Sequence, residues 1–253
     1  MPEALSAVGA TPGLIWLLLA IGLAGIVRGF TGFGTALIFV PVAGIFLPPQ
    51  IIVGVITLTG IASTSALLPR AWKHADRREV AVLACAALVT VPVGLWLMAQ
   101  LDPVSIRWVV AGVGSVTLGA LITGWRFSGH VSRPMLVAIG GVAGVIGGLT
   151  GLTGPVVILF YLAGQSVAQS VRANTILFLA ALDVVIVVNL LLRGAVNGQI
   201  FLLALVLAVP YFITSLIGQS LFDPRHERLY RWVAYAVIGL AVLSGLPIWN
   251  KGV

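Results

Sequence analysis

Two phrases of the sequence combine residues that could bind an anion in an apolar environment. The first, RGFTGFG at residues 28–34, contains Arg28, Thr31, Gly32 and Gly34. An arginine donates paired hydrogen bonds to an oxyanion, and glycines permit the backbone to leave helical geometry. A helix that starts after such a break directs unpaired N–H groups and a positive dipole end toward it. The phrase therefore predicts a break that attracts anions.

The second phrase repeats this chemistry about half a chain later. It reads GGLTGLTGP at residues 147–155 and contains Thr150, Gly151, Thr153 and Gly154. The threonine hydroxyls add hydrogen-bond donors to those of the backbone. Short apolar segments that glycines interrupt at matching positions of two halves are typical of transporter binding sites. We therefore expect the two breaks to meet in one substrate site.

The glycines upstream of the breaks have another explanation, which is helix packing. Small residues four positions apart let membrane helices approach closely. We favour packing for five glycines with this spacing, which are Gly25, Gly29, Gly140, Gly144 and Gly148.

Three ionisable residues lie in or beside apolar runs: Arg28, Arg172 and Asp183. A charge at mid-membrane costs at least about 2.5–3.5 kcal/mol on insertion scales, so each is a candidate functional residue. We expect Arg28 to bind substrate or to act in gating. Arg172 could bind substrate or reach a lipid headgroup by snorkelling. Asp183 could carry a coupling proton, pair with Arg28, or hold the hairpin by hydrogen bonds.

The composition identifies lipid as the solvent of this chain. Of its 253 residues, 60% are hydrophobic and 8% are charged, whereas soluble domains carry about 25% charged residues. The net charge of +7 fits cytoplasmic loops of a membrane protein better than a nucleic-acid partner. One cysteine, three loop histidines and no known catalytic motif predict no enzyme, no metal site and no cofactor.

The second half of the sequence also repeats the first. A shift of about 119 residues places Gly32 on Gly151 and Gln50 on Gln169, and Arg107-Trp108-Val109 matches Arg231-Trp232-Val233 farther along. Such an ordered series predicts an internal repeat.

We expect an all-α polytopic membrane protein with two inverted repeats in one integral membrane domain. Each repeat contains a glycine-broken, re-entrant helical hairpin and three transmembrane helices. Repeat 1 covers residues 1–130, with its hairpin at 13–47 and spans at 50–69, 80–100 and 106–125. Repeat 2 covers 131–253, with its hairpin at 135–164 and spans at 171–192, 198–221 and 231–249. The last three runs of each half have the ~20 residues that a full crossing needs.

Basic residues give the orientation. Nine fall in three loops: Arg70, Lys73, Arg77 and Arg78; Arg126 and Arg133; Arg225, Arg228 and Arg231. Because such loops stay in the cytoplasm, both termini are expected outside. The loop near Arg193 then lies outside and the loop before residue 80 inside, so the two halves are inverted.

The phrases RGFTGFGTALIFVP and GGLTGLTGPVVILFYL, together with the duplication, resemble the sulfite exporter TauE/SafE family of bacterial membrane transporters. The resemblance covers nearly the whole chain. It implies export or import of small anions, such as sulfite, organosulfonates or related sulfur or carboxylate compounds. We therefore expect a proton-coupled secondary transporter in the bacterial inner membrane, and the basic loops predict that both termini lie on the periplasmic side. The expected partners are the small anion, protons and membrane lipid. The alternative is an anion channel of the same architecture, which needs no coupling residue.

Overall fold

The regular secondary structure of the computed structural model is helical throughout the described residues, which are 8–124, 132–163, 168–221 and 227–248. The first half contains α2 (Leu14–Thr31), α3 (Thr35–Ala43), α4 (Pro49–His74), α5 (Arg77–Gln100) and α6 (Pro103–Thr123). The second half contains α7 (Arg133–Thr150), α8 (Pro155–Ala163), α9 (Ala168–Leu192), α10 (Gly198–Ser220) and α11 (Glu227–Gly245). The expected all-α class is confirmed.

Side chains just before several helices satisfy the first backbone N–H groups. The Asp76 carboxylate accepts from the N–H of Arg78 and of Glu79, and the Asn197 side chain accepts from Ile200. Asp102 accepts from both the backbone N–H and the hydroxyl of Ser105, and these bonds hold the pKa of its carboxyl below the usual value. Such residues fix where a helix begins.

The helices have the length and surface of membrane spans. Within the described residues, five stretches are long and apolar enough to cross a bilayer: α5, α6, α7, α10 and Ala173–Leu192 of α9. Large apolar side chains such as Trp16, Val89 and Leu240 lie on outward faces. An apolar surface of this kind suits lipid rather than water, so the protein is a multi-pass membrane protein.

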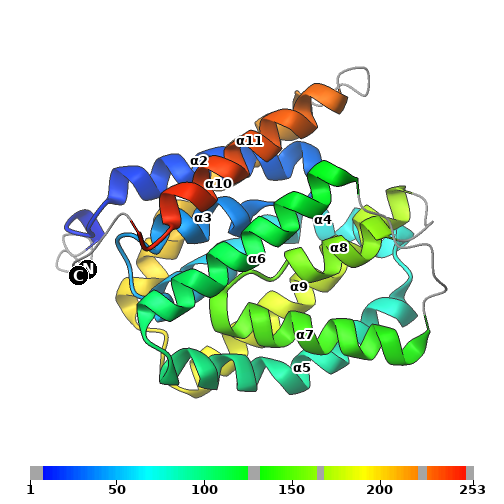
Figure 1. Cartoon of the computed structure of the whole chain (residues 1–253), viewed down its shortest axis with the longest axis horizontal. Coiled ribbons are helices and arrows are strands. Elements are labelled where there is room, and N and C mark those ends of the chain that lie inside the picture. Colours follow the sequence, from blue (N-terminus) through cyan, green and yellow to red (C-terminus); the bar gives the residue numbers. More distant parts are fainter. Residues whose placement is uncertain (1–7, 125–131, 164–167, 222–226, 249–253) are drawn as a thin grey trace.

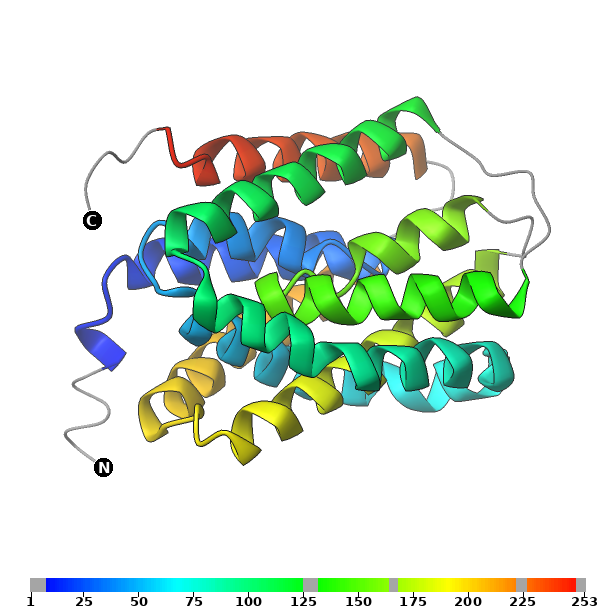
Figure 2. The same cartoon turned by 60° about the horizontal axis from the view of Figure 1, so that its bottom comes forward.

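Each glycine phrase joins a long helix to a short one. The chain enters α2 and leaves α3 at the same end of the bundle, and it enters α7 and leaves α8 at the opposite end (Figures 1 and 2). α2 and α7 have 18 residues each, whereas α3 and α8 have nine. At 1.5 Å per residue these arms are about 27 and 14 Å long. The second arm of each pair is thus too short to cross a bilayer.

Helices of the two halves pack against each other in matching pairs. α2 packs on α10 and α7 on α5, while α3 lies against α11 and α8 against α6. Glycines make the closest approaches, since a Cβ on Gly29 would meet the backbone of Ser215 and Gly218, and one on Gly148 would meet the backbone of Val91. The packing role expected for the upstream glycines is confirmed.

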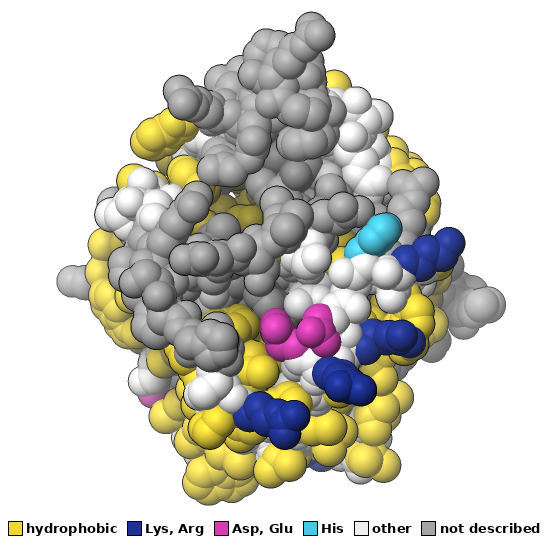
Figure 3. All heavy atoms as spheres, turned by 90° about the vertical axis from the view of Figure 1, so that its right-hand side faces the viewer, with side chains coloured by type: hydrophobic (Ala, Val, Ile, Leu, Met, Phe, Trp, Pro, Cys, Tyr) yellow, Lys and Arg dark blue, Asp and Glu magenta, His cyan; other side chains and the backbone are white. Residues whose placement is uncertain are grey.

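Basic side chains form a cluster at one end of the bundle. The junction of α4 and α5 and the start of α7 lie at one end, where Lys and Arg side chains gather (Figures 1 and 3). Three of them, Lys73, Arg77 and Arg78, are exposed at the α4–α5 junction. The turn between α9 and α10 lies at the opposite end (Figures 1 and 2).

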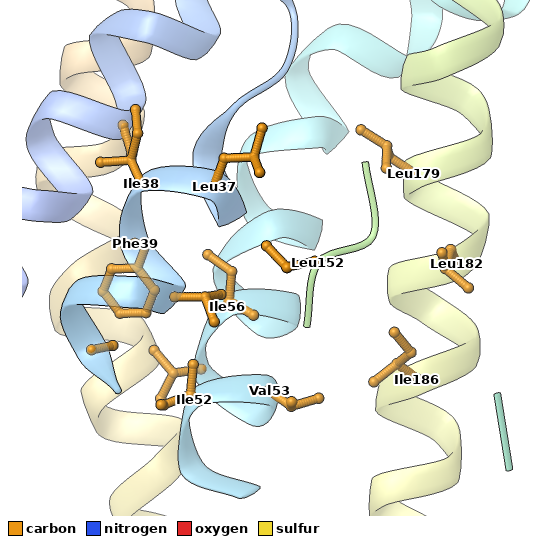
Figure 4. Close-up of a cluster of buried hydrophobic side chains, with 14 of the residues drawn as sticks. Leu37, Ile38, Phe39, Ile52, Val53, Ile56, Leu152, Leu179, Leu182 and Ile186 are labelled. Carbon is orange, nitrogen blue, oxygen red and sulfur yellow. The ribbon is translucent and has the colours of Figure 1, made fainter. Parts of the chain in front are cut away.

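The linker between α7 and α8 passes through the centre of the bundle. Its Leu152 is fully buried between α4 and α9, near Ile56 of α4 and Leu182 of α9 (Figure 4). Phe39 of α3 is also fully buried. Both side chains belong to one buried apolar cluster.

Candidate functional site

The two glycine phrases leave helical geometry at equivalent positions. Gly32 ends α2 with φ 81°, and Gly151 ends α7 with φ 77°. Gly34, directly before α3, has φ 97°. Because left-handed backbone is costly for residues with a Cβ, glycine is required at these three places. The predicted breaks are confirmed.

The threonines before these glycines stabilise the breaks from within. The hydroxyl of Thr31 lies 2.7 Å from the Val27 carbonyl and accepts from the N–H of Phe33 at 3.2 Å. The hydroxyl of Thr150 donates to Ile146 at 2.7 Å and accepts from the N–H of Leu152 at 3.1 Å. Each hydroxyl therefore satisfies backbone groups that the end of the helix leaves unpaired.

A cavity lies between the two breaks. Its empty volume is about 430 Å³, part of which opens to the outside. Five of the residues expected in the site line it: Arg28, Gly34, Thr153, Gly154 and Asp183. They come from α2, α9 and the two starts of the short helices, so the cavity brings together both halves of the chain.

Arg28 is the main positive group of this cavity. Its side chain is only 6% exposed, which excludes snorkelling to a headgroup. One guanidinium nitrogen donates to the Thr64 hydroxyl at 2.8 Å. The buried Nε has no acceptor in the described part of the chain. A buried donor without a partner costs about 1–3 kcal/mol, so Arg28 is held ready for an acceptor.

Further donors surround the same space. The backbone at the start of α3, from Gly34 to Leu37, lines the cavity, and no side chain caps this helix. Its first N–H groups therefore have no partner within the helix. Thr153, at the second break, adds a hydroxyl to the lining. The set suits an anion with several acceptor oxygens.

Asp183 is the carboxylate of the cavity. Its side chain is 5% exposed and interacts electrostatically with Arg28. Gly60 of α4 lies across from it, and a Cβ there would collide with the carboxylate oxygen. Glycine at position 60 is what leaves room for the acid.

Other expected site residues lie elsewhere. Thr31, Gly32 and Gly151 shape the breaks but do not line the cavity. Thr150 lines a second cavity of about 390 Å³, beside Arg107. The Arg172 side chain lies outside the described residues.

From their place in an apolar run, Asn174 and Asn189 are expected to bond between helices rather than to bind substrate. The structure confirms this for one of them. Asn174 of α9 accepts from the N–H of Asp76 and donates to Glu79, so it ties two elements together. Asn189 donates to the Val185 carbonyl of its own helix, and the expectation for this residue was wrong. A free carbonyl one turn back is the nearest acceptor for such a side chain.

Three residues that line the cavity, Thr35, Gly60 and Tyr211, were not predicted from the sequence. Thr64, which accepts a hydrogen bond from Arg28, was not predicted either. Only Tyr211 gave a usable signal, because a tyrosine hydroxyl in an apolar run needs a buried partner. The described residues contain no group of three His, Cys, Asp or Glu side chains that could hold a metal.

Comparison with known proteins agrees with the geometry. The family model for the sulfite exporter TauE/SafE family matches residues 17–245. No curated protein and no solved structure matches the chain. The matched segment contains both breaks and every described residue of the cavity. The matched family consists of membrane transporters of sulfite and related anions and not of enzymes. The chain therefore belongs to the sulfite exporter TauE/SafE family.

Proposed function

We propose that this protein is a proton-coupled secondary transporter of small anions in the bacterial inner membrane. The substrate class is sulfite, organosulfonates and related sulfur or carboxylate compounds. One observation carries the proposal: the unpaired Nε of buried Arg28 in a cavity that both helix breaks line. Intramembrane charges of this kind belong to substrate or ion pathways.

The anion binds between the breaks. Arg28 supplies the full positive charge, and the helix starts that follow Gly34 and Gly154 supply partial positive charge. Thr153 contributes a hydroxyl. Arg172 is proposed as a second cation near the substrate. Thr31, Gly32, Thr150 and Gly151 act indirectly by keeping the two helix starts aimed at the site.

The two halves are proposed to be inverted repeats of residues 1–130 and 131–253. The matching helix pairs support this, as does the placement of the α4–α5 and α9–α10 turns at opposite ends. In such transporters the site lies at the repeat interface near mid-membrane. Rocking of one half against the other would open the site alternately to each side.

Asp183 is the proposed proton carrier. The titratable groups that line its cavity are Arg28 from α2 and Tyr211 from α10, and the described side chains of α3, α4 and α8 add none. A bare Asp183 carboxylate competes with the anion for Arg28. A protonated Asp183 leaves Arg28 to the anion, so anion and proton bind together.

Flux into proteoliposomes tests this function. With sulfite as the probe, the purified protein should concentrate the anion when the outside is more acidic than the lumen. An anion channel would only equilibrate sulfite down its own gradient. The Arg28→Gln protein serves as the inactive control. If the sulfite concentration in the lumen never exceeds the value at electrochemical equilibrium, the protein is a channel rather than a transporter.

A further inference from the structure

The cavity contains a pair of hydroxyls that the proposed mechanism has not used. Thr35 is the first residue of α3, and Tyr211 lies on α10, 176 positions later in the chain. Their oxygens are 2.8 Å apart. Tyr211 is fully buried and Thr35 is 6% exposed, and both line the cavity.

We propose that Thr35 and Tyr211 form a hydroxyl pair that binds the transported anion directly, in the cavity that Arg28 also lines. The inference rests on the proposed function, because it names further residues of the same site. It assigns Tyr211, far from both glycine phrases in the sequence, as a substrate-binding residue.

A count of protons supports this role. Each hydroxyl carries one proton and can also accept. Either oxygen can be the donor in the bond between Thr35 and Tyr211, and that bond uses one of the two protons. The second proton has no acceptor among the described residues, and both hydroxyl groups belong to residues that line the cavity. An anion oxygen in the cavity would accept it.

The position of the pair fits the other donors. Thr35 belongs to the first turn of α3, whose N–H groups also lack partners within the helix. Arg28 lines the same cavity with its unpaired Nε. One anion with separate oxygens can therefore accept from the guanidinium, the backbone and the hydroxyl pair together. An anion held from three directions has a single orientation.

The backbone around Tyr211 is arranged for close contact. Gly25 of α2 lies against the Tyr211 carbonyl, where a Cβ would be too close. The glycine lets α10 approach α2, which carries Arg28 one turn farther along. In the first half, the internal alignment that sets Pro92 on Pro210 places Val93 at the position that corresponds to Tyr211, and valine has no hydroxyl. The internal repeat therefore does not provide a second hydroxyl pair of this kind in the site.

The alternative role is structural, in which the two hydroxyls only tie α3 to α10. Sulfite affinity and thermal stability, measured on the full-length protein, separate the two roles. Tyr211→Phe and Thr35→Val each remove one hydroxyl, Thr35→Ser retains it, and Tyr235→Phe on α11 is the matched control away from the cavity.

For Tyr211→Phe we expect the Kd for sulfite to rise about tenfold to a hundredfold, the loss typical of a hydrogen bond to a charged group. Thr35→Val should weaken binding similarly, while Thr35→Ser and Tyr235→Phe should bind as the unaltered protein does. The melting temperature should change little in all four proteins.

Two results would overturn the hydroxyl pair. One is an unchanged Kd in Tyr211→Phe while Arg28→Gln loses binding, which leaves the proposed function standing. The other is an affinity loss that Thr35→Ser does not avoid and that parallels a fall in melting temperature. If the unaltered protein itself does not bind sulfite, both the proposed function and this inference fail.

Discussion

Burial of Arg28 has two free-energy costs that a residue needed only for packing would avoid. It places a charge inside the membrane and leaves its Nε without an acceptor in the described structure. A neutral side chain such as glutamine would fill the same space at lower cost. A substrate anion removes both costs, because it supplies the missing acceptor and the opposite charge.

Arg28→Gln should therefore weaken sulfite binding by about a hundredfold, and Arg28→Lys by about tenfold, because lysine keeps the charge but loses the paired geometry. Equilibrium binding to the detergent-purified proteins measures both. Exposed Arg78, at the α4–α5 junction, gives the matched control Arg78→Gln. Unchanged affinity in Arg28→Gln would contradict the binding role.

Among the described residues, Asp183 is the only carboxylate that lines the central cavity. Asparagine has nearly the same shape but cannot exchange a proton. Asp183→Asn should bind sulfite with an affinity close to that of the unaltered protein at acidic pH, and its flux should no longer depend on pH. Counterflow measured from pH 5 to pH 8 tests this. Flux that keeps its pH dependence in Asp183→Asn would exclude the coupling role.

At the scale of elements, the breaks depend on backbone that only glycine adopts without strain. Gly151 has φ 77°, and an added Cβ would lie 3.1 Å from the Ile56 side chain. Gly151→Ala should cost about 1–2 kcal/mol of local strain and shift the start of α8. We expect at least a tenfold loss of sulfite uptake with protein still in the membrane.

Gly119→Ala is the control for that experiment. Gly119 lies within α6, where an added Cβ meets nothing within 4 Å. This change should leave uptake unaltered and slightly favour the helix. Normal uptake in Gly151→Ala would show that the break need not have its left-handed glycine.

The elements were more predictable than their contacts. Hydrophobic run length and glycine spacing predicted the breaks at Gly32 and Gly151 because those signals are local. The hydrogen bonds of Thr31 and Thr150 to the nearby backbone could not be predicted, because the folded geometry decides whether a hydroxyl bonds to the backbone or to a ligand.

Only part of the site could be predicted, because only some of its residues give a local signal in the sequence. Arg28 and Asp183 stand out as charges in apolar runs, so composition alone made them candidates. Thr35 and Tyr211 are ordinary residues in sequence, and only the packing of α3 near α10 brings their oxygens together. The sequence gives no sign that Gly60 leaves room for Asp183, because that contact joins two distant helices.

At the scale of the whole molecule, the helix pairs follow one correspondence. The proposed internal repeat makes α2 equivalent to α7, α3 to α8, α4 to α9, α5 to α10 and α6 to α11. The contact between α2 and α10 should then have a counterpart between α7 and α5, and the contact between α3 and α11 one between α8 and α6. All four contacts are observed. The pair α4–α9 maps onto itself. This pattern supports the proposed repeats and places the central pair on their axis.

The orientation of this arrangement can be tested with single cysteines. Cys85 is exposed on α5, so Cys85→Ser provides the background. His74→Cys lies at the basic α4–α5 junction, and Gln199→Cys is exposed at the start of α10, next to Asn197, which is left intact as the cap.

Basic loops remain in the cytoplasm, and the two turns lie at opposite ends of the bundle (Figure 1). A membrane-impermeant maleimide added to intact spheroplasts should therefore label Gln199→Cys, and should label His74→Cys only after the membrane is opened. Labelling of His74→Cys alone in intact spheroplasts would reverse the orientation, and labelling of both would contradict the opposite placement of the turns.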